Sequence, residues 1–406
     1  MKVRRNTRIG ACLSIAIAGL FLITSFVPFN AVADNIYIRY GSINEYASNP
    51  VVGVPAGEAS VKDPSVIYSS GMYYMAYSVC RTNGSAYIGM SNSTDFHSWT
   101  YMGMVIGNNY SWDSNNSGAP FLFQDGSTYY IYWQGKNTTG NWSIGVASTS
   151  TINNASSWTQ YAGNPILVGN WGETYYAYDA SVLKVGSTYY LYYICGGYGV
   201  PARGTSLATS PDKFNWTRYG RVISPSSSYV SGIEATNILQ LQSNLYVAYF
   251  TDWNASMLQI TGDSYSTDML TWTDVNKYNT PFLTGLHAWD ANGASSPSMI
   301  IDPTNAGQLL LAYQGDSGGD AWTIGVASVN FDVRPLAFID AQSRALVNLV
   351  FMIFAVGIVV GVVAEGTSSL RKMQMRTAEQ MMKSLLNMVI YIVIGMASLG
   401  IIYSMV

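Results

Sequence analysis

The chain has 406 residues, of which only 11% are charged, and its formal net charge is −3. The stretch from residue 34 to residue 340 holds 21 acidic and 11 basic residues, whereas a nucleic-acid-binding domain needs a basic face. Composition therefore excludes nucleic acid as a partner and argues against a polyanionic substrate.

The first 33 residues have the pattern of a targeting segment. Lys2, Arg4, Arg5 and Arg8 form a basic start, and an apolar stretch follows at 9–27. The sequence Ala-Val-Ala at 31–33 is a small-x-small cleavage site, which predicts a signal peptide over 1–33. The alternative is an uncleaved signal anchor, because the apolar stretch is close to the shortest length that spans a bilayer.

A hairpin pattern then recurs five times. Each copy has an apolar strand, a Gly or polar turn and a second strand, often rich in Tyr. The copies are KDPSVIYSSGMYYMAYS (62–78), GAPFLFQDGSTYYIYWQ (118–134), YDASVLKVGSTYYLYYI (178–194), IEATNILQLQSNLYVAYFT (233–251) and SSPSMIIDPTNAGQLLLAYQ (295–314). Positions 63, 118, 179, 234 and 296 are predicted to be equivalent, at intervals of 55, 61, 55 and 62 residues.

The second half of each repeat adds two more strands. In the first four copies, the last of these carries a Trp, at Trp99, Trp158, Trp216 and Trp272. Four short strands per unit of this length are typical of a β-propeller blade. The sequence thus predicts an all-β, five-bladed β-propeller over 34–340, with the segment NIYIRY (35–40) supplying the outer strand that the fifth unit lacks.

The last 66 residues, 341–406, predict a transmembrane helical hairpin. The segments 345–364 and 384–404 carry no charge and are each long enough to span a bilayer. The loop between them, 365–383, carries Arg371, Lys372, Arg376 and Lys383, so the positive-inside rule makes it cytoplasmic and the propeller extracellular. The predicted location is a cell surface or a virion envelope, and self-association through the membrane helices is a further expectation.

Sequons and cysteines fit an exported chain. Nine Asn-x-Ser/Thr triplets predict a glycoprotein, at Asn83, Asn92, Asn109, Asn115, Asn137, Asn141, Asn154, Asn215 and Asn254. Cys80 and Cys195 fall in units that are not neighbours, so a disulfide between them is not expected. No Cys/His cluster has the spacing of a zinc site.

Three acidic residues occupy the predicted equivalent position. They are Asp63, Asp179 and Glu234, and the other two units place Gly118 and Ser296 there. Because the inner strands of a propeller start beside its central channel, these carboxylates are expected to converge, and their mutual repulsion suggests function. The alternative is three independent turn residues, since Asp before Pro commonly starts a turn. Paired carboxylates in different protonation states suit glycoside cleavage.

These motifs resemble the five-bladed propeller glycosidases of glycoside hydrolase family 43, the arabinanase and β-xylosidase type. The resemblance implies that Asp63 of KDPSV is the general base, Asp179 of YDASV tunes the acid, and Glu234 of IEATNI is the general acid of an inverting reaction. No cofactor is required for this chemistry. The resemblance also implies a structural Ca²⁺ in the propeller channel, with His287 as its nearby histidine, although the spacing of His287 departs from the family pattern.

Further side chains are candidates for sugar binding, because sugar rings need flat apolar surfaces and hydrogen-bonding partners. The aromatic candidates are Trp112, Trp133, Trp171, Tyr178, Trp253 and Trp289, and the polar candidates are Gln134, Arg203 and Gln314. The alternatives are blade packing for the aromatic residues and plain surface positions for the polar ones.

The leading prediction is a membrane-anchored extracellular glycosidase that cleaves neutral, pentose-containing glycans. The alternatives are a propeller lectin or adhesin without turnover and a structural envelope protein of a cell or virion. The three acids favour the enzyme, whereas the membrane hairpin and the sequons favour the surface-protein alternatives.

Overall fold

The computed structural model describes residues 36–169, 176–196, 203–224, 233–253, 259–274, 283, 285, 287–319 and 321–335. The predicted signal peptide and both predicted membrane spans lie outside these ranges. Within them, no helix has the length and apolar character needed to cross a membrane. The only helical turn in the described part is η1 (Ala155–Ser157).

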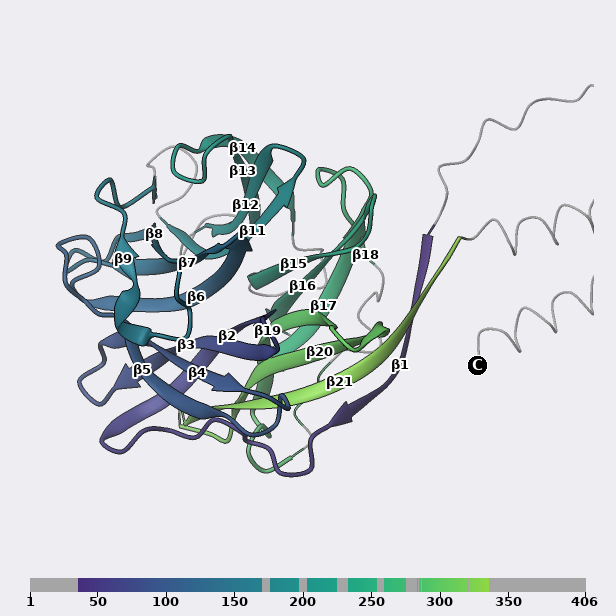
Figure 1. The fold of residues 1–406 in the computed structure, drawn as a ribbon, viewed down its shortest axis with the longest axis horizontal. Coiled ribbons are helices and arrows are strands. Elements are labelled where there is room, and N and C mark those ends of the chain that lie inside the picture. Colours follow the sequence, from purple (N-terminus) through teal and green to yellow (C-terminus); the bar gives the residue numbers. More distant parts are fainter. Residues whose placement is uncertain are drawn as a thin grey trace, which may run out of the picture. The chain divides into compact units, whose positions relative to one another are not determined.

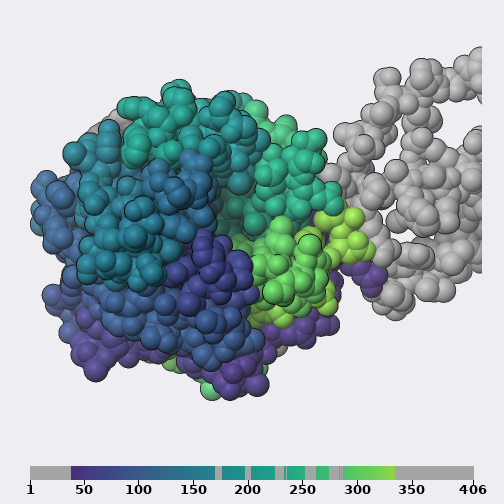
Figure 2. Space-filling view, viewed as in Figure 1, coloured from purple at the N-terminus to yellow at the C-terminus, as the bar shows by residue number. Residues whose placement is uncertain are grey.

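The described residues form a five-bladed β-propeller, as the repeats predicted (Figure 1). Blade 1 has β2 (Glu58–Ser69), β3 (Met72–Arg81), β4 (Ala86–Ser93) and β5 (Thr100–Ile106). Blade 2 has β6 (Asn116–Asp125), β7 (Thr128–Lys136), β8 (Trp142–Thr149) and the short strands β9 (Thr159–Gln160) and β10 (Leu167–Val168). Blade 3 has β11 (Ala177–Val185), β12 (Thr188–Cys195), β13 (Gly204–Ser210) and β14 (Thr217–Ile223). In Figure 2 these segments follow one another around the propeller from purple to teal.

The last two blades share one sheet. Blade 4 has β15 (Glu234–Gln242), β16 (Leu245–Trp253), β17 (Gln259–Ser266) and β18 (Thr273–Asp274). Blade 5 has β19 (Gly293–Asp302), β20 (Asn305–Asp316), β21 (Trp322–Pro335) and β1 (Ile36–Glu45). β1 pairs with β21, so the N-terminal strand is the outer strand of the last blade, as predicted. This pairing covers the edge of blade 5.

The outer tryptophans stand at the ends of turns rather than inside the outer strands. The turns of blades 1, 3 and 4 share a Ser-x-Asp start, and Asp95, Asp212 and Asp268 accept backbone N–H groups two and three residues further on. The indole N–H of Trp99, Trp216 and Trp272 closes each turn on a backbone carbonyl three residues earlier. The prediction that these tryptophans lie in the strands was therefore wrong by one residue.

Apolar side chains fill the spaces between neighbouring blades. Four buried clusters lie at the junctions of blades 1 and 2, 2 and 3, 3 and 4, and 5 and 1. The Tyr-rich strands supply many of the largest buried side chains, including Tyr77, Tyr132, Tyr192, Tyr249 and Tyr313. Because each blade buries both faces, the strands are apolar on both sides, and Tyr fits because aromatic residues favour strands.

Every inner strand has a two-residue bulge at the same place. The register to the second strand shifts between Lys62 and Ser65, and equally in the other blades after Gly118, Tyr178, Glu234 and Ser295. A bulge leaves backbone groups without a partner in their own sheet. Those groups find partners in the neighbouring blade instead.

A first ring of hydrogen bonds joins the bulges to the preceding blades. The N–H groups donate as follows: Ala119 to Ser78 Oγ (2.8 Å), Asp179 to Gln134 Oε1 (3.2 Å), Ser296 to Thr251 Oγ1 (2.7 Å) and Asp63 to Gln314 Oε1 (2.9 Å). The position that would complete the ring, between blades 3 and 4, is Ile194, whose side chain has no acceptor.

A second ring lies directly beyond the bulges. In this ring, backbone N–H groups again donate to side chains of the preceding blade: Leu122 to Ser65 Oγ (2.8 Å), Ile238 to Ser181 Oγ (3.0 Å), Met299 to Asn237 Oδ1 (3.2 Å) and Val66 to Ser298 Oγ (2.9 Å). Phe121 stands at the fifth acceptor position, between blades 2 and 3, and has no acceptor. Both rings include the step from blade 5 to blade 1, so they close the propeller at its axis.

Replacing Ser298 by Ala should destabilise the propeller. The change leaves the buried N–H of Val66 without its acceptor, and such a loss costs about 1–3 kcal/mol. Urea unfolding followed by tryptophan fluorescence measures the change in the free energy of unfolding. Ser243→Ala, at an exposed turn, is the control and should stay within about 0.5 kcal/mol of the parent. Equal stability of the two variants would contradict the role of the second ring.

Candidate active site

The bulges line a pocket at the propeller axis. It has a cavity volume of about 40 Å³, is open toward solvent and is lined by residues of β2, β6, β11, β15 and β19. The first bulged residue has a positive φ at Asp63 (55°), Ala119 (41°), Asp179 (50°) and Ser296 (48°). This conformation is costly for a residue other than Gly, so the interblade hydrogen bonds to these N–H groups hold the side chains in place.

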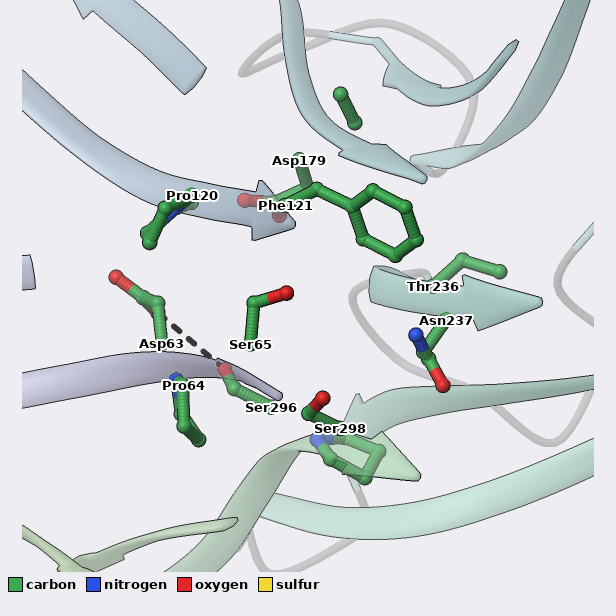
Figure 3. A pocket seen from close by; sticks show the side chains of 13 residues that line it. Asp63, Pro64, Ser65, Pro120, Phe121, Asp179, Thr236, Asn237, Ser296 and Ser298 are labelled. Atoms are coloured by element: carbon green, nitrogen blue, oxygen red, sulfur yellow. Dashed lines mark hydrogen bonds between the residues drawn. The ribbon is translucent and has the colours of Figure 1, made fainter. Parts of the chain in front are cut away.

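The pocket brings Asp63 and Asp179 together, as predicted. Both carboxyl groups line it from different blades, and Figure 3 shows them with Ser65, Phe121 and Ser296 around the same space. Glu234 is not part of this lining. Glu234 is the last paired residue before the bulge of β15, whereas Asp63 and Asp179 are the first residues inside their bulges.

The predicted equivalence of Glu234 with Asp63 and Asp179 was therefore wrong by one residue. The positions that correspond to Glu234 are Lys62, Gly118, Tyr178 and Ser295, each of which precedes the register shift. Gly118 was misplaced in the same way, because Ala119 is the counterpart of Asp63. The repeats were aligned by placing the acidic residues at one position, which hid the one-residue offset of Glu234. The sequence alone does not show where a bulge begins.

Asp63 is held by two hydroxyl groups. Ser78 Oγ donates to Asp63 Oδ2 at 2.8 Å, and Ser296 Oγ donates to Oδ1 at 3.4 Å. Ser78 is buried, and its hydroxyl both donates to the carboxylate of Asp63 and accepts the N–H of Ala119. Hydrogen bonds to a carboxylate are among the stronger ones in proteins, and here they fix which way Asp63 faces. Sequence analysis placed Ser296 at the shared position without giving it a role, and it missed Ser78.

Gln134 and Gln314 serve the site indirectly. Gln134 Oε1 accepts the N–H of Asp179, and Gln314 Oε1 accepts that of Asp63. Gln314 is buried, and its Nε2 donates to Ser295 Oγ at 3.0 Å. The prediction of Gln314 as a sugar ligand was therefore wrong, because both ends of its amide are used inside the protein. Gln134 positions the backbone of Asp179.

Glu234 lies with two other predicted residues. Arg203 forms an ion pair with Glu234 Oε1, and Tyr178 OH donates to the same oxygen at 3.4 Å. The side chains of Glu234 and Arg203 keep 20% and 24% of their surface exposed, so the pair is accessible. Tyr178 directly precedes Asp179 in β11. The contacts therefore place Glu234 of blade 4 against the strand of blade 3 that carries Asp179.

The predicted aromatic sugar platform is largely internal. Trp133 is 0% exposed, so its prediction as a sugar-binding residue was wrong. The indole ring of Trp112 packs directly on Gly135 and Gly145, in the space that a side chain at either position would fill. Its ring centroid lies 5.3 Å from that of Trp133. Trp289 packs in the same way against the two equivalent glycines of blade 5. Tyr178, beside Trp142 at 6.2 Å, is the aromatic candidate that reaches an acid. Trp171 and the side chain of Trp253 lie outside the described residues.

His287 is not at the channel. It does not line the axial pocket, and its Nδ1 lies 2.9 Å from Glu45 Oε2 beside blade 5. The prediction of His287 as the histidine of a channel cation was therefore wrong. The oxygen atoms of Asp63, Asp179 and Ser296 would suit a hard cation such as Ca²⁺ in the pocket itself.

The fold defines a class, the five-bladed β-propellers, here with an acid-lined axial pocket. A solved glycoside hydrolase structure matches with a TM-score of 0.59 and 17% identity, over 72% of this chain and 92% of that chain. The catalytic domain of a GH62 alpha-L-arabinofuranosidase from Coprinopsis cinerea matches with a TM-score of 0.55 and 18% identity, over 71% and 97%. At these identities the likeness concerns the fold.

The sequence comparisons point to one family in that class. The model of glycosyl hydrolases family 43 matches residues 49–175, which include Asp63 and the whole of blade 1. Probable arabinan endo-1,5-alpha-L-arabinosidases A from Aspergillus flavus and Aspergillus oryzae are 30% identical over 162 residues, or 38% of this chain. The match spans about half the length of these relatives, 47%. The predicted resemblance to the family 43 propeller glycosidases is confirmed.

Replacing Gly135 by Ala should show that Trp112 is a packing residue. A Cβ at Gly135 would lie 2.2 Å from Trp112 Cζ3 and 2.6 Å from Asp113 Cβ, so the indole has to move. Overpacking of this kind costs about 1–3 kcal/mol of unfolding free energy. Gly53→Ala is the control, because a Cβ at Gly53 meets no atom within 4 Å. Thermal unfolding measures both, and an unchanged midpoint for Gly135→Ala would return Trp112 to the sugar-binding candidates.

Proposed function

We propose that the protein is a glycoside hydrolase that cleaves neutral, arabinose-containing glycans with inversion at the anomeric carbon. The observation that carries the proposal is the pair Asp63 and Asp179 in one solvent-open axial pocket, with Asp63 inside the family 43 match. The arabinan-acting relatives support an arabinose-containing substrate. The acidic balance of 34–340 supports a neutral one.

In this proposal Asp63 is the general base. Its carboxylate takes a proton from the water that attacks the anomeric carbon, and the hydroxyls of Ser78 and Ser296 orient it. The fixed backbone at the bulge places the carboxylate without a rearrangement on binding.

Glu234 is the general acid, which must hold a proton before it protonates the leaving oxygen. Arg203 forms an ion pair with Glu234 Oε1, and Tyr178 OH donates to the same oxygen. These two contacts would hold the carboxyl group in position beside the leaving oxygen of a bound glycan.

Asp63→Asn and Glu234→Gln should each lower the hydrolysis of debranched arabinan by about 10²- to 10⁴-fold or more, because each removes a proton-transfer group. The assay is reducing-sugar release by the purified full chain, with proton NMR of the first product to establish its anomeric configuration. Glu58→Gln, on the same strand as Asp63 but away from the pocket, is the control and should keep full activity. Full activity of Asp63→Asn would refute the assignment, and tight arabinan binding without product would favour the lectin alternative.

We also propose that the propeller is displayed outside a membrane on the hairpin 345–364 and 384–404, after removal of residues 1–33. Support comes from two uncharged segments of spanning length and from the basic loop 365–383 between them. In this arrangement the sequons face the side on which glycosylation occurs, and carbohydrate substrates reach the axial pocket directly.

Protease added to intact cells or sealed vesicles should remove the propeller and spare the loop 365–383, because a basic loop stays on the cytoplasmic side. An epitope inserted in the loop and another after residue 34 report the two sides by immunoblot. Detergent-permeabilised vesicles are the control, in which both epitopes should be lost. Loss of the loop epitope from intact vesicles would overturn the topology.

A further inference from the structure

Blades 2 and 5 contain the same turn before their inner strand. The sequences are SWDSN at 111–115 and AWDAN at 288–292. In both, the Trp packs on two glycines, and the Asp is 0% exposed. Asp113 Oδ1 accepts the N–H of Tyr110 at 2.9 Å, and Asp290 Oδ1 accepts that of His287 at 2.7 Å. One carboxylate oxygen therefore has the same structural task in each turn.

The second carboxylate oxygen differs between the two turns. Asp113 Oδ2 accepts the hydroxyl of Ser117 at 3.2 Å, but Ala294 stands at the corresponding place in blade 5. Asp290 Oδ2 is buried and accepts no hydrogen bond from any residue that the structure describes. Burial raises the pKa of both carboxyl groups. A buried carboxylate oxygen without a partner is costly, which indicates that Asp290 is kept for something other than the turn.

Two further ligand groups lie close to the carboxyl group of Asp290. His287, at the position of Tyr110, lies with Nδ1 2.9 Å from Oε2 of Glu45, the last residue of β1. One ligand atom each from Glu45, His287 and Asp290 can be chosen so that all three lie within 4.8 Å of one another. The side chain of His287 is 54% exposed, so the group is open to solvent on one side. Burial and the charges of Glu45 and Asp290 also raise the pKa of the buried Tyr313 hydroxyl.

We propose that Glu45, His287 and Asp290 form a divalent transition-metal site of the zinc type. One imidazole nitrogen, two carboxylate oxygens and an open position for water make a four-coordinate set that suits Zn²⁺, whereas Ca²⁺ prefers oxygen ligands throughout. Bonds of about 2.0–2.2 Å place tetrahedral ligand atoms about 3.3–3.6 Å apart. The 2.9 Å pair of His287 and Glu45 would therefore open slightly, and any ligand separation closer to the 4.8 Å limit would shorten. The exposed imidazole can supply that movement.

The proposed metal site is separate from the axial pocket, and its role would be structural. None of its three ligands lines that pocket. Glu45 belongs to the N-terminal strand that pairs with β21, whereas His287 and Asp290 precede β19 of the same blade. A bound ion would join the outermost strand of blade 5 to the turn that starts its innermost one. It would therefore lock the N-terminal strand that completes the propeller.

The test is calorimetric titration of ZnCl₂ into the EDTA-treated, dialysed full chain in detergent, with CaCl₂ as the comparison ion. We expect one zinc ion per chain and a rise in the thermal unfolding midpoint. His287→Gln and Glu45→Gln should weaken zinc binding by 10-fold or more and remove that rise. Ala294→Ser, which restores the hydroxyl found in blade 2, should weaken zinc binding as well, because it gives Asp290 Oδ2 a competing partner.

His97→Gln is the matched control, because it removes the chain's other histidine and should leave zinc binding unchanged. Absence of zinc binding to the parent chain would overturn the proposal and leave His287 as a simple ion-pair partner of Glu45. Equal zinc binding by the parent and by His287→Gln would overturn it too. These readouts are independent of hydrolysis, so the proposed enzymatic function can fail while the metal site stands.

Discussion

The propeller depends on one repeated constraint, the bulge in each inner strand whose N–H groups must find acceptors in the neighbouring blade. Two rings of side chains, mostly Ser, Thr, Gln and Asn, meet that need and close across the step from blade 5 to blade 1. The same bulge turns a side chain into the axial pocket in a left-handed conformation. The same bulges therefore close the propeller and place Asp63 and Asp179 in the pocket.

The fold was largely predictable because its signals repeat. Five hairpins at regular spacing, the outer tryptophans and the early NIYIRY strand together predicted five blades and the strand that completes them. The convergence of Asp63 and Asp179 followed from propeller geometry alone. The one-residue offset of Glu234 could not be predicted, because a bulge changes the strand register without changing the composition of the strand. The sequence also could not show that Gln314 and Trp133 point inward, since polar and aromatic residues occur on both sides of these strands.

Comparison of blades within the chain separates packing from chemistry. Trp112 and Trp289 share one turn and one pair of glycine contacts, which identifies them as packing residues. The same comparison isolates Asp290, whose second oxygen lacks the serine that Asp113 has. Differences between repeats that fold alike thus carry more functional information than any single motif.

The two gaps in the rings fall on either side of blade 3. Phe121 leaves one link between blades 2 and 3, and Ile194 leaves one between blades 3 and 4, whereas the other junctions have two each. At the second gap, Tyr178 and Arg203 of blade 3 contact Glu234 of blade 4 instead. In the proposed function, the side chains that bridge this second gap are also ones that the substrate would meet. Of the five blades, blade 3 therefore has the fewest ring hydrogen bonds to its neighbours, and its junction with blade 4 relies on other contacts, including the buried hydroxyl pair of Thr205 and Thr236 at 2.7 Å.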